Sequence, residues 1–405
     1  MERRLLVVFA LTFLVILLFQ PLLKKYGPQP PAKTESSQVA QNQAQAPSPS
    51  STQTPSQAPE SAAGPRPAGR TNASVPTQTS APQVAASETE TVIENDVYRI
   101  VFTNRGGRVK SWVLKKYTDE KGGLLELVNA AAAEKHGYPL TLWSYREDLR
   151  DKLNSALYVV TSSGATAPAE IKFAYDDGDL SVQKSFTFDR NSYVVGVKTA
   201  VYEKGTQVTA FPMWPAGLGG DTTGAQYATA QIVYQYDDKV ERLAIKKISG
   251  GATLSGPFNW AGVSDQYFAA VFLPQDPKNA AMVTLHNAIE IPRGGDSKQV
   301  DKADVLGAAV GSLKGPSEAR LYVGPKALGD LEAVAVPGIT GAEPDLRAII
   351  DFGWLGIIAR PLFLWLKWMH SHIVPNWGWA ILLQTLVINV ALLPLRISQM
   401  KSMLK

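Results

Sequence analysis

The sequence predicts a mainly β protein, in which one large domain of antiparallel sheets is held at a membrane by apolar helices. Three observations lead to this prediction. One apolar run lies near the start of the chain and another near its end. Between 91 and 342, short alternating strands are separated by Gly, Asn and Asp turns. Many short strands with such turns are typical of a sandwich of antiparallel sheets.

The composition argues against several kinds of site. The chain has 405 residues, with 40 lysines and arginines, 36 acidic residues and a formal net charge of +4. No basic block with interleaved aromatics stands out, so we expect no nucleic-acid partner. There is no cysteine, which removes disulfides, thiolate catalysis and cysteine metal sites. With only four histidines, we expect neither a histidine-rich metal site nor a cofactor.

Residues 1–26 are predicted to form a transmembrane anchor. The run from Leu5 to Phe19 is apolar apart from Thr12, and it extends to Leu23. A helix over this run would be roughly 28 Å long at ~1.5 Å per residue, close to the bilayer core thickness. A cleaved signal peptide is the alternative, but the run ends in Gln-Pro-Leu-Leu-Lys-Lys rather than a small-residue cleavage site. We therefore favour an uncleaved anchor.

Residues 27–90 are predicted to be a disordered linker. Proline, glutamine, alanine, serine and threonine dominate this segment, and no basic residue occurs between Lys33 and Arg66. Such a segment cannot bury enough apolar surface to offset its chain entropy. A flexible linker of about 60 residues has an r.m.s. reach of roughly 45 Å.

Residues 91–342 are predicted to form the β domain. Val97 to Phe102 alternates imperfectly, Asn104-Arg-Gly-Gly107 supplies a turn, and the alternation resumes from Val109 to Leu114, which indicates a hairpin. Leu180 to Phe188 alternates with period two and is followed by a turn and a second strand, Tyr193 to Val201. Further strands are expected at Tyr267–Leu273, Ala281–Leu285 and Ala319–Val323.

Residues 345–373 are predicted to be an amphipathic helical segment at the membrane interface. Tryptophan, lysine and arginine occur together in it, as they do at membrane–water boundaries. The residues expected to anchor it there are Trp354, Arg360, Trp365, Lys367 and Trp368. Pro361 suits the first turn of a new helix better than the middle of an older one.

Residues 376–396 are predicted to be a second transmembrane helix, with 397–405 as the start of a cytoplasmic loop. The apolar run from Trp377 to Leu395 is long enough to span a bilayer. If 345–373 also spanned the membrane, the basic residues after this run would lie outside, against the positive-inside rule. With two spans, both termini are cytoplasmic and the β domain is outside, although Lys24 and Lys25 do not fit this arrangement.

The sequence gives little support for an enzyme. A sandwich that acts on sugars needs a histidine and a carboxylate that converge on the ring, and the β domain offers only His136 and His286. Asp176, Asp177 and Asp179 cluster beside a glycine, where solvated acids are ordinary in a turn. We therefore predict that the protein is not an enzyme.

The later part of the chain resembles the YidC insertases. The residues that carry the resemblance are Ile350-Asp-Phe-Gly-Trp-Leu355, Arg360-Pro-Leu-Phe363, Leu366-Lys-Trp-Met-His370, Asn376-Trp-Gly378, Pro394-Leu395 and Ser402-Met403. Weaker markers lie in the β domain, at Gly106-Gly107, Tyr193, Gln266-Tyr-Phe268 and Val323-Gly-Pro325. The resemblance covers nearly all of the chain except the linker.

This resemblance implies a Gram-negative inner-membrane protein with a periplasmic β super-sandwich domain. It also implies that the protein helps to insert and fold nascent inner-membrane proteins. It would do so alone or beside the Sec translocon, and in contact with membrane lipids. The family acts through a hydrophilic groove, which lowers the cost of moving polar segments into the bilayer, and it catalyses no bond cleavage. The family's remaining transmembrane helices would follow Lys405, and the sequence leaves open whether the chain is a fragment or a truncated protein.

Asn389 and Thr385 are the candidate groove residues. Together with Arg396 they share one face of a helix. Asn389 stands where the family usually carries an arginine, so a neutral amide replaces a charge. The alternative is structural: Thr385 bonds its own helix, Asn389 joins two helices, and Arg396 reaches the headgroups. For the whole chain, the alternative function is a membrane-tethered periplasmic binding or scaffold module.

Overall fold

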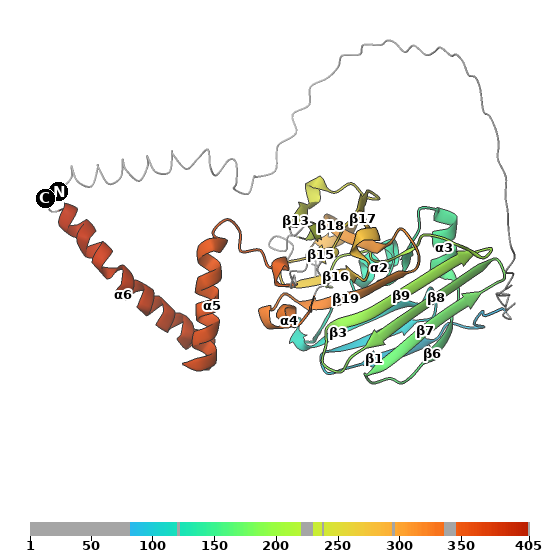
Figure 1. Ribbon diagram of the computed structural model, residues 1–405, viewed down its shortest axis with the longest axis horizontal. Coiled ribbons are helices and arrows are strands. Elements are labelled where there is room, and N and C mark those ends of the chain that lie inside the picture. The colour runs from blue at the N-terminus through green and yellow to red at the C-terminus, as the bar shows by residue number, and fades with distance from the viewer. Residues whose placement is uncertain are drawn as a thin grey trace, which may run out of the picture. The chain divides into compact units, whose positions relative to one another are not determined.

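The structure is a computed structural model that describes residues 82–119, 122–219, 230–236, 239–293, 296–335 and 346–403. Side chains are not described at 291–301, 395–396, 398 or 400–403. The predicted anchor (1–26) and most of the predicted linker lie outside the described residues. The described part contains an antiparallel β domain followed by two helices (Figure 1).

Three sheets form the β domain, and their antiparallel pairing confirms the mainly β prediction. The four-stranded sheet contains β1 (Glu90–Glu94), β2 (Tyr98–Thr103), β3 (Arg108–Thr118) and β4 (Leu124–Glu126). The ten-stranded sheet contains, in spatial order, β13 (Lys239–Ala244), β12 (Gln231–Tyr236), β15 (Trp260–Ser264), β16 (Phe268–Pro274), β19 (Ser317–Pro325), β9 (Val194–Glu203), β8 (Leu180–Phe188), β7 (Ala169–Asp176) and β6 (Val159–Ser162), with β10 (Thr206–Gln207) beside β9. The five-stranded sheet contains β14 (Thr253–Ser255), β17 (Ala280–Arg293), β18 (Asp296–Ser312), β11 (Phe211–Trp214) and β5 (Leu142–Trp143).

Strict alternation in β8 and β9 builds the core. Every second residue of β8 is buried, and Phe188 pairs with Val195 at one end of the ladder while Leu180 pairs with Glu203 at the other. The buried faces of the four-stranded and ten-stranded sheets meet at Phe102, whose ring lies 5.3 Å from that of Phe186. In Figure 1 the blue strands of the smaller sheet lie against the green strands of the larger one. Two apolar faces pressed together in this way exclude water from both.

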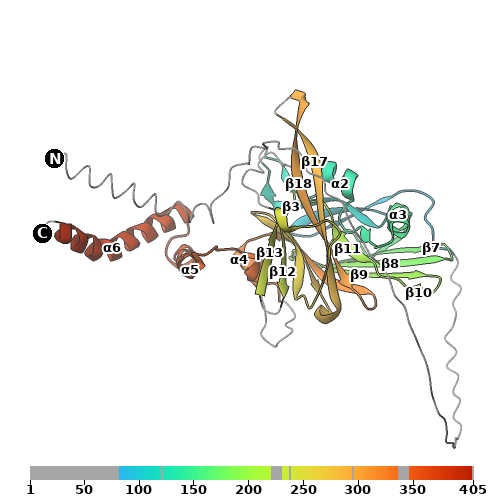
Figure 2. The same ribbon diagram turned by 90° about the horizontal axis from the view of Figure 1, so that it is seen from above.

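The third sheet joins the same core through tryptophan. The rings of Trp112 in β3 and Trp214 in β11 lie 5.8 Å apart, edge to face, and both side chains are buried. Its long strands β17 and β18 pair from Ala280 opposite Ser312 almost to the hairpin tip. Figure 2 shows this pair projecting beyond the other strands of the domain.

Short helices connect the strands, and two longer helices follow the β domain. The α-helices are α2 (Ala130–His136), α3 (Glu147–Ser155), α4 (Leu328–Glu332), α5 (Gly356–His372) and α6 (Trp377–Met403), and the 3₁₀ turns are η1 (Ile245–Lys247), η2 (Pro277–Asn279) and η3 (Leu346–Ile349). Asn129 begins α2 with a cap, because its side-chain oxygen accepts a hydrogen bond from the N–H of Ala132 at 3.0 Å.

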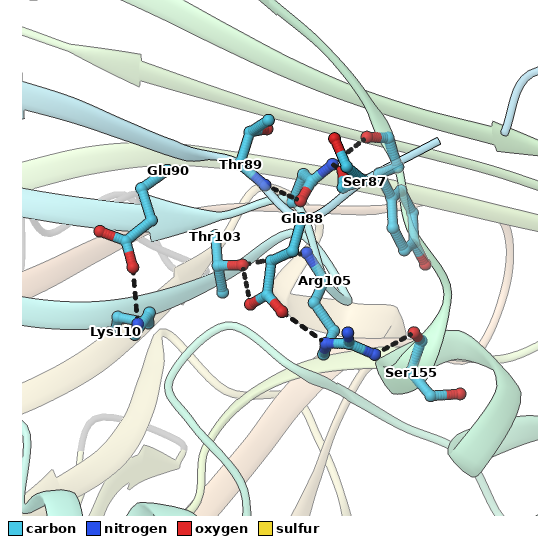
Figure 3. A network of polar contacts seen from close by, with 10 residues as sticks. Ser87, Glu88, Thr89, Glu90, Thr103, Arg105, Lys110 and Ser155 are labelled. Carbon is cyan, nitrogen blue, oxygen red and sulfur yellow. Dashed lines mark hydrogen bonds and ion pairs between the residues drawn. The ribbon is translucent and has the colours of Figure 1, made fainter. Parts of the chain in front are cut away.

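The end of the predicted linker is part of the domain, so the boundary at 90 is wrong. Gln83 exchanges two backbone hydrogen bonds with Asp176, at 2.9 and 3.0 Å. Glu88 accepts hydrogen bonds from the Thr103 hydroxyl at 2.8 Å and from Arg105 Nε at 2.9 Å (Figure 3). Backbone and polar contacts hold this segment, so its low apolar content did not reveal that it is ordered.

A second difference concerns the start of the interfacial segment. Leu346 and Ile349, in η3, are buried in the core of the β domain, and the Arg242 guanidinium donates to the Ala348 carbonyl at 2.8 Å. The α-helix begins at Gly356, about ten residues later than the sequence suggested. Apolar residues that the pattern assigned to the membrane interface therefore belong partly to the soluble core.

Pro361 and the expected loop after 396 also differ from expectation. Pro361 lies in the second turn of α5, not the first. Its missing N–H removes the hydrogen bond to the carbonyl four residues earlier, and its ring crowds that carbonyl. The helix nevertheless continues through it to His372. In the same way α6 continues past Pro394 to Met403, through most of the segment predicted as a loop.

Candidate functional site: the helical hairpin after the β domain

The hairpin of α5 and α6 holds all of the candidate site residues except Trp354, which precedes α5. Within the described residues, the stretch of α6 from Trp377 to Pro394 is the one long and apolar enough to cross a membrane. Its residues project mostly outwards from the protein, and Leu382 and Leu386 are each 60% exposed. An exposed apolar helix of this length is what a bilayer requires.

The two helices are joined by stacked rings and one hydrogen bond. His370 of α5 stacks on Trp377 of α6, with ring centroids 3.8 Å apart and planes 9° from parallel. Gln384 Nε2 donates to the Leu362 carbonyl at 3.0 Å. Ala380 is completely buried in the described structure, so its small side chain allows close approach.

Gln384 is a site residue to which sequence analysis gave no role. It follows the buried Ala380 by four positions, which places both on the α6 face that meets α5. A small residue and an amide four apart in an apolar run are a recognisable signal for helix pairing. The role of joining two helices, considered for Asn389, therefore belongs to Gln384 among the described residues.

Thr385 and Asn389 bond within α6. The Thr385 hydroxyl donates to the Ile381 carbonyl at 2.8 Å, and Asn389 Nδ2 donates to the Thr385 carbonyl at 2.8 Å. At about 100° per residue, the two side chains lie roughly 100–140° around the helix from Gln384. Their face is therefore turned away from α5. The Arg396 side chain lies outside the described residues, so its place on this face is not shown.

The expected interfacial residues are distributed around α5. Arg360 and Lys367 are seven positions apart and share one polar stripe, and Lys367 Nζ lies 3.8 Å from Glu332 Oε2 of α4. Trp368 is half exposed and Trp365 is partly buried. Trp354 precedes the helix and is 89% exposed. The structure thus brings Arg360 and Lys367 together on one side, but not the three tryptophans.

A mostly apolar groove lies between α4 and α5. It has a volume of about 690 Å³, and Lys326 and Lys367 stand among its lining residues. Its apolar walls come from Leu328, Ile350, Phe352, Phe363 and Leu366. The sequence alone does not indicate this groove, because its two sides come from different elements of the fold.

The histidines of the β domain are engaged with structural partners. His286 Nδ1 lies 3.2 Å from the Ile248 carbonyl, and its Nε2 lies 3.0 Å from Asp304 Oδ1. His136 Nε2 lies 3.2 Å from the Ala288 carbonyl. In the described ranges, no three His, Cys, Asp or Glu side chains gather as a metal site would need.

The acidic cluster after β7 makes a turn, as the sequence suggested. Asp177 Oδ1 accepts the N–H of Leu180 at 2.8 Å, and Asp176 Oδ1 accepts that of Gly178 at 2.9 Å. Lys152 Nζ lies 2.6 Å from Asp177 Oδ2. Although partial burial acts to raise it, the pKa of Asp177 is lowered overall by Lys152, the Leu180 N–H and the Tyr175 hydroxyl. The Asp177 carboxylate therefore stabilises the turn in its ionised form.

Comparison with known proteins identifies relatives of this chain. A family model described as the YidC periplasmic domain matches residues 90–365. A "Membrane protein insertase YidC" of Bordetella avium (strain 197N) is 27% identical, over 78% of this chain and 56% of its own length. That of Burkholderia multivorans is 28% identical, over 88% of this chain and 65% of its own length. That of Syntrophus aciditrophicus is 26% identical, over 100% of this chain and 72% of its own length.

The chain spans 56% and 65% of the lengths of the first two of these relatives. Solved structures that resemble it include an active YidC insertase, with a TM-score of 0.29 and 16% identity over 80% of this chain and 59% of that chain. Another is a putative aldose 1-epimerase of Escherichia coli K12, with a TM-score of 0.37 and 10% identity over 59% of this chain and 100% of that chain. The family match covers well over half of the chain, and the chain therefore belongs to the YidC family.

Proposed function

We propose that this chain is the periplasmic domain, interfacial helix and part of the membrane portion of a membrane protein insertase. The observation that carries the proposal is the family match over 90–365, which runs from β1 into α5. The insertase names of the relatives and the exposed apolar surface of α6 support it. The clients are nascent inner-membrane proteins, and the membrane is the bacterial inner membrane.

The membrane arrangement proposed here has two spans. Residues 1–26 form the first anchor, 376–396 form the second span, and both termini are cytoplasmic. The helix α5 lies in the outer interface, where Trp365 and Trp368 sit among the headgroups and Arg360 and Lys367 reach water. The β domain outside is a binding or contact domain rather than an enzyme, and Sec translocon components are candidate partners for it.

In this proposal, Thr385 and Asn389 form part of the path that a client segment takes. Each unsatisfied backbone group that enters hydrocarbon costs several kcal/mol, so a polar stripe within the bilayer lowers the barrier to insertion. The Asn389 amide uses one N–H on the Thr385 carbonyl. Its oxygen and second N–H have no partner in the described part of the chain, and they are free to bind a client. Because the amide is neutral, it does not attract acidic client segments by charge.

Substitution of Asn389 tests this role. In an insertion assay in proteoliposomes with a single-span client, Asn389→Leu should insert the client about fivefold more slowly, as expected for one lost hydrogen bond of ~1 kcal/mol. Asn389→Arg should retain insertion and favour clients with acidic segments. Val390→Leu is the matched control, since this neighbour is 61% exposed and apolar. Equal insertion by Asn389→Leu and the parent would remove Asn389 from the client path.

A further inference from the structure

We propose that the groove between α4 and α5 holds an acyl chain of a membrane phospholipid, whose phosphate lies on Lys326 and Lys367. This inference rests on the proposed function, because it takes α5 to lie at the membrane surface. It assigns the periplasmic domain a direct lipid ligand in addition to its attachment through membrane helices.

The shape and chemistry of the groove suit a hydrocarbon chain. At about 690 Å³ it falls in the ~300–1,000 Å³ range typical of small-molecule sites. Leu328 supplies one wall from the β domain, while Phe363 and Leu366 supply the other from α5. His370 and Trp377, whose rings stack on each other, also line the groove. Apolar walls of this kind gain free energy when an apolar chain displaces water.

The ammonium groups of Lys326 and Lys367, which line the groove, have N–H donors that are not used within the protein. Lys326 Nζ donates to the Asp265 carbonyl at 2.8 Å, and burial lowers the pKa of this lysine, so a nearby phosphate would favour its charged form. Lys367 Nζ lies 3.8 Å from Glu332, beyond ordinary hydrogen-bond length. An ammonium carries three N–H donors, so each lysine can still donate to a phosphate.

The acidic side chains nearby argue for an amphiphile rather than a free anion. Glu332 lies on α4 and pairs with Arg347 at 3.2 Å, and Asp330 lies on the same helix. A free polyanion would meet these carboxylates without using the apolar walls. A phospholipid uses both the walls and the two lysines.

A second, exposed flank of α5 explains why a lipid would lie close to the groove. Ile357, Leu364 and Trp368 are 88%, 44% and 50% exposed. At about 100° per residue, they lie roughly 100–140° around the helix from the groove-lining Phe363. A helix with this exposed apolar face lies partly sunk among headgroups and acyl chains. The apolar groove lies on the other flank of the same helix, within reach of the same lipid layer.

Photolabelling tests the inference directly. The full chain is placed in nanodiscs that contain phosphatidylethanolamine with a diazirine on one acyl chain, irradiated, and mapped by mass spectrometry. We expect label on Leu328 and its neighbours in α4, as well as on α5 and α6. Label on α4 is decisive, because α4 belongs to the β domain rather than to the membrane helices.

Matched variants separate the groove from the bilayer surface. Leu366→Trp fills the groove and should lower α4 labelling about tenfold, whereas Leu364→Trp, on the exposed face, should leave it unchanged. Lys367→Gln should also lower it, by about tenfold for one lost charge-assisted contact. Label on α5 and α6 but not α4 would overturn the groove assignment and leave the proposed membrane arrangement standing. Absence of label from all three helices would overturn both.

Discussion

Lys184 is a titratable residue almost wholly inside the β domain, with 1% of its surface exposed. Its Nζ donates to three carbonyls, those of Gly106 and Gly107 at 2.8 Å and of Leu140 at 2.6 Å. Gly106 has φ +70°, and a Cβ there would lie 2.6 Å from the Asn154 carbonyl oxygen. The turn therefore needs glycine at this position, both for its conformation and for its packing. The turn directs backbone carbonyls into the core, and Lys184 supplies their hydrogen-bond donor.

The titration of Lys184 gives a stability prediction. Burial, with a smaller contribution from Arg108, lowers the pKa of Lys184 to about 7, against about 10.4 in an unfolded chain. Between these values the unfolded chain binds a proton that the native protein does not, so the free energy of unfolding rises with pH. This pH-dependent gain in the free energy of unfolding is complete above about pH 10.4 and is lost as pH falls to about 7.

Urea unfolding in detergent, followed by tryptophan fluorescence, measures this effect. From pH 7.5 to 9.0 the parent should gain about 1–2 kcal/mol relative to Lys184→Met, given ~1.4 kcal/mol per pH unit at most. The Met variant itself should be less stable by about 2–4 kcal/mol, since three carbonyls lose their donor. Parallel pH profiles for the two proteins would show that Lys184 does not titrate in this range.

A side-chain hydrogen bond and a ring stack orient α6 relative to α5. Two polar side chains of α6 bond within their own helix, and Gln384 alone of the three bonds across to α5. Within a membrane such a hydrogen bond contributes about 0.6–2 kcal/mol to helix association. Together with the His370–Trp377 stack, it fixes the angle between α5 and α6.

Replacement of Gln384 should loosen this hairpin. In Gln384→Leu, spin labels at Leu364 in α5 and Val387 in α6 should report a broader distance distribution by pulsed electron paramagnetic resonance. Thr385→Val is the control, because the Thr385 hydroxyl bonds inside α6 and its loss should leave the distribution unchanged. This chain has no native cysteine to interfere with labelling. An unchanged distribution in Gln384→Leu would assign the helix angle to packing alone.

For the whole molecule, the proposed two-span arrangement predicts the side of the membrane for each region. Basic residues flank the two apolar runs at Arg3 and Arg4 and at Lys401 and Lys405, and such residues favour the cytoplasm. In intact spheroplasts, an impermeant maleimide should label Gly164→Cys, which lies in an exposed loop of the β domain. It should label Lys405→Cys only after the membrane is permeabilised. Labelling of both positions in intact spheroplasts would contradict an even number of spans.

Local periodicity in the sequence was enough to predict that the domain is built of strands and that the last apolar run is a helix. The predicted strand from Leu180 to Phe188 has the bounds observed for β8, because alternation within one segment already defines which face is buried. The same alternation places Lys184 on the core face, between Val182 and Phe186. The run from Trp377 to Leu395 likewise falls within α6.

Tertiary structure decided which partners these elements meet. The docking of Gln83 on Asp176, the contact of Lys184 with Gly106 across 78 positions, and the bond from Gln384 to Leu362 all join separate segments. The burial of Leu346 in the β domain rather than at the membrane was decided in the same way. Periodicity records only that a residue faces an apolar or a polar surrounding. The identity of that surrounding is set by chain segments distant in sequence, which only the folded molecule brings together.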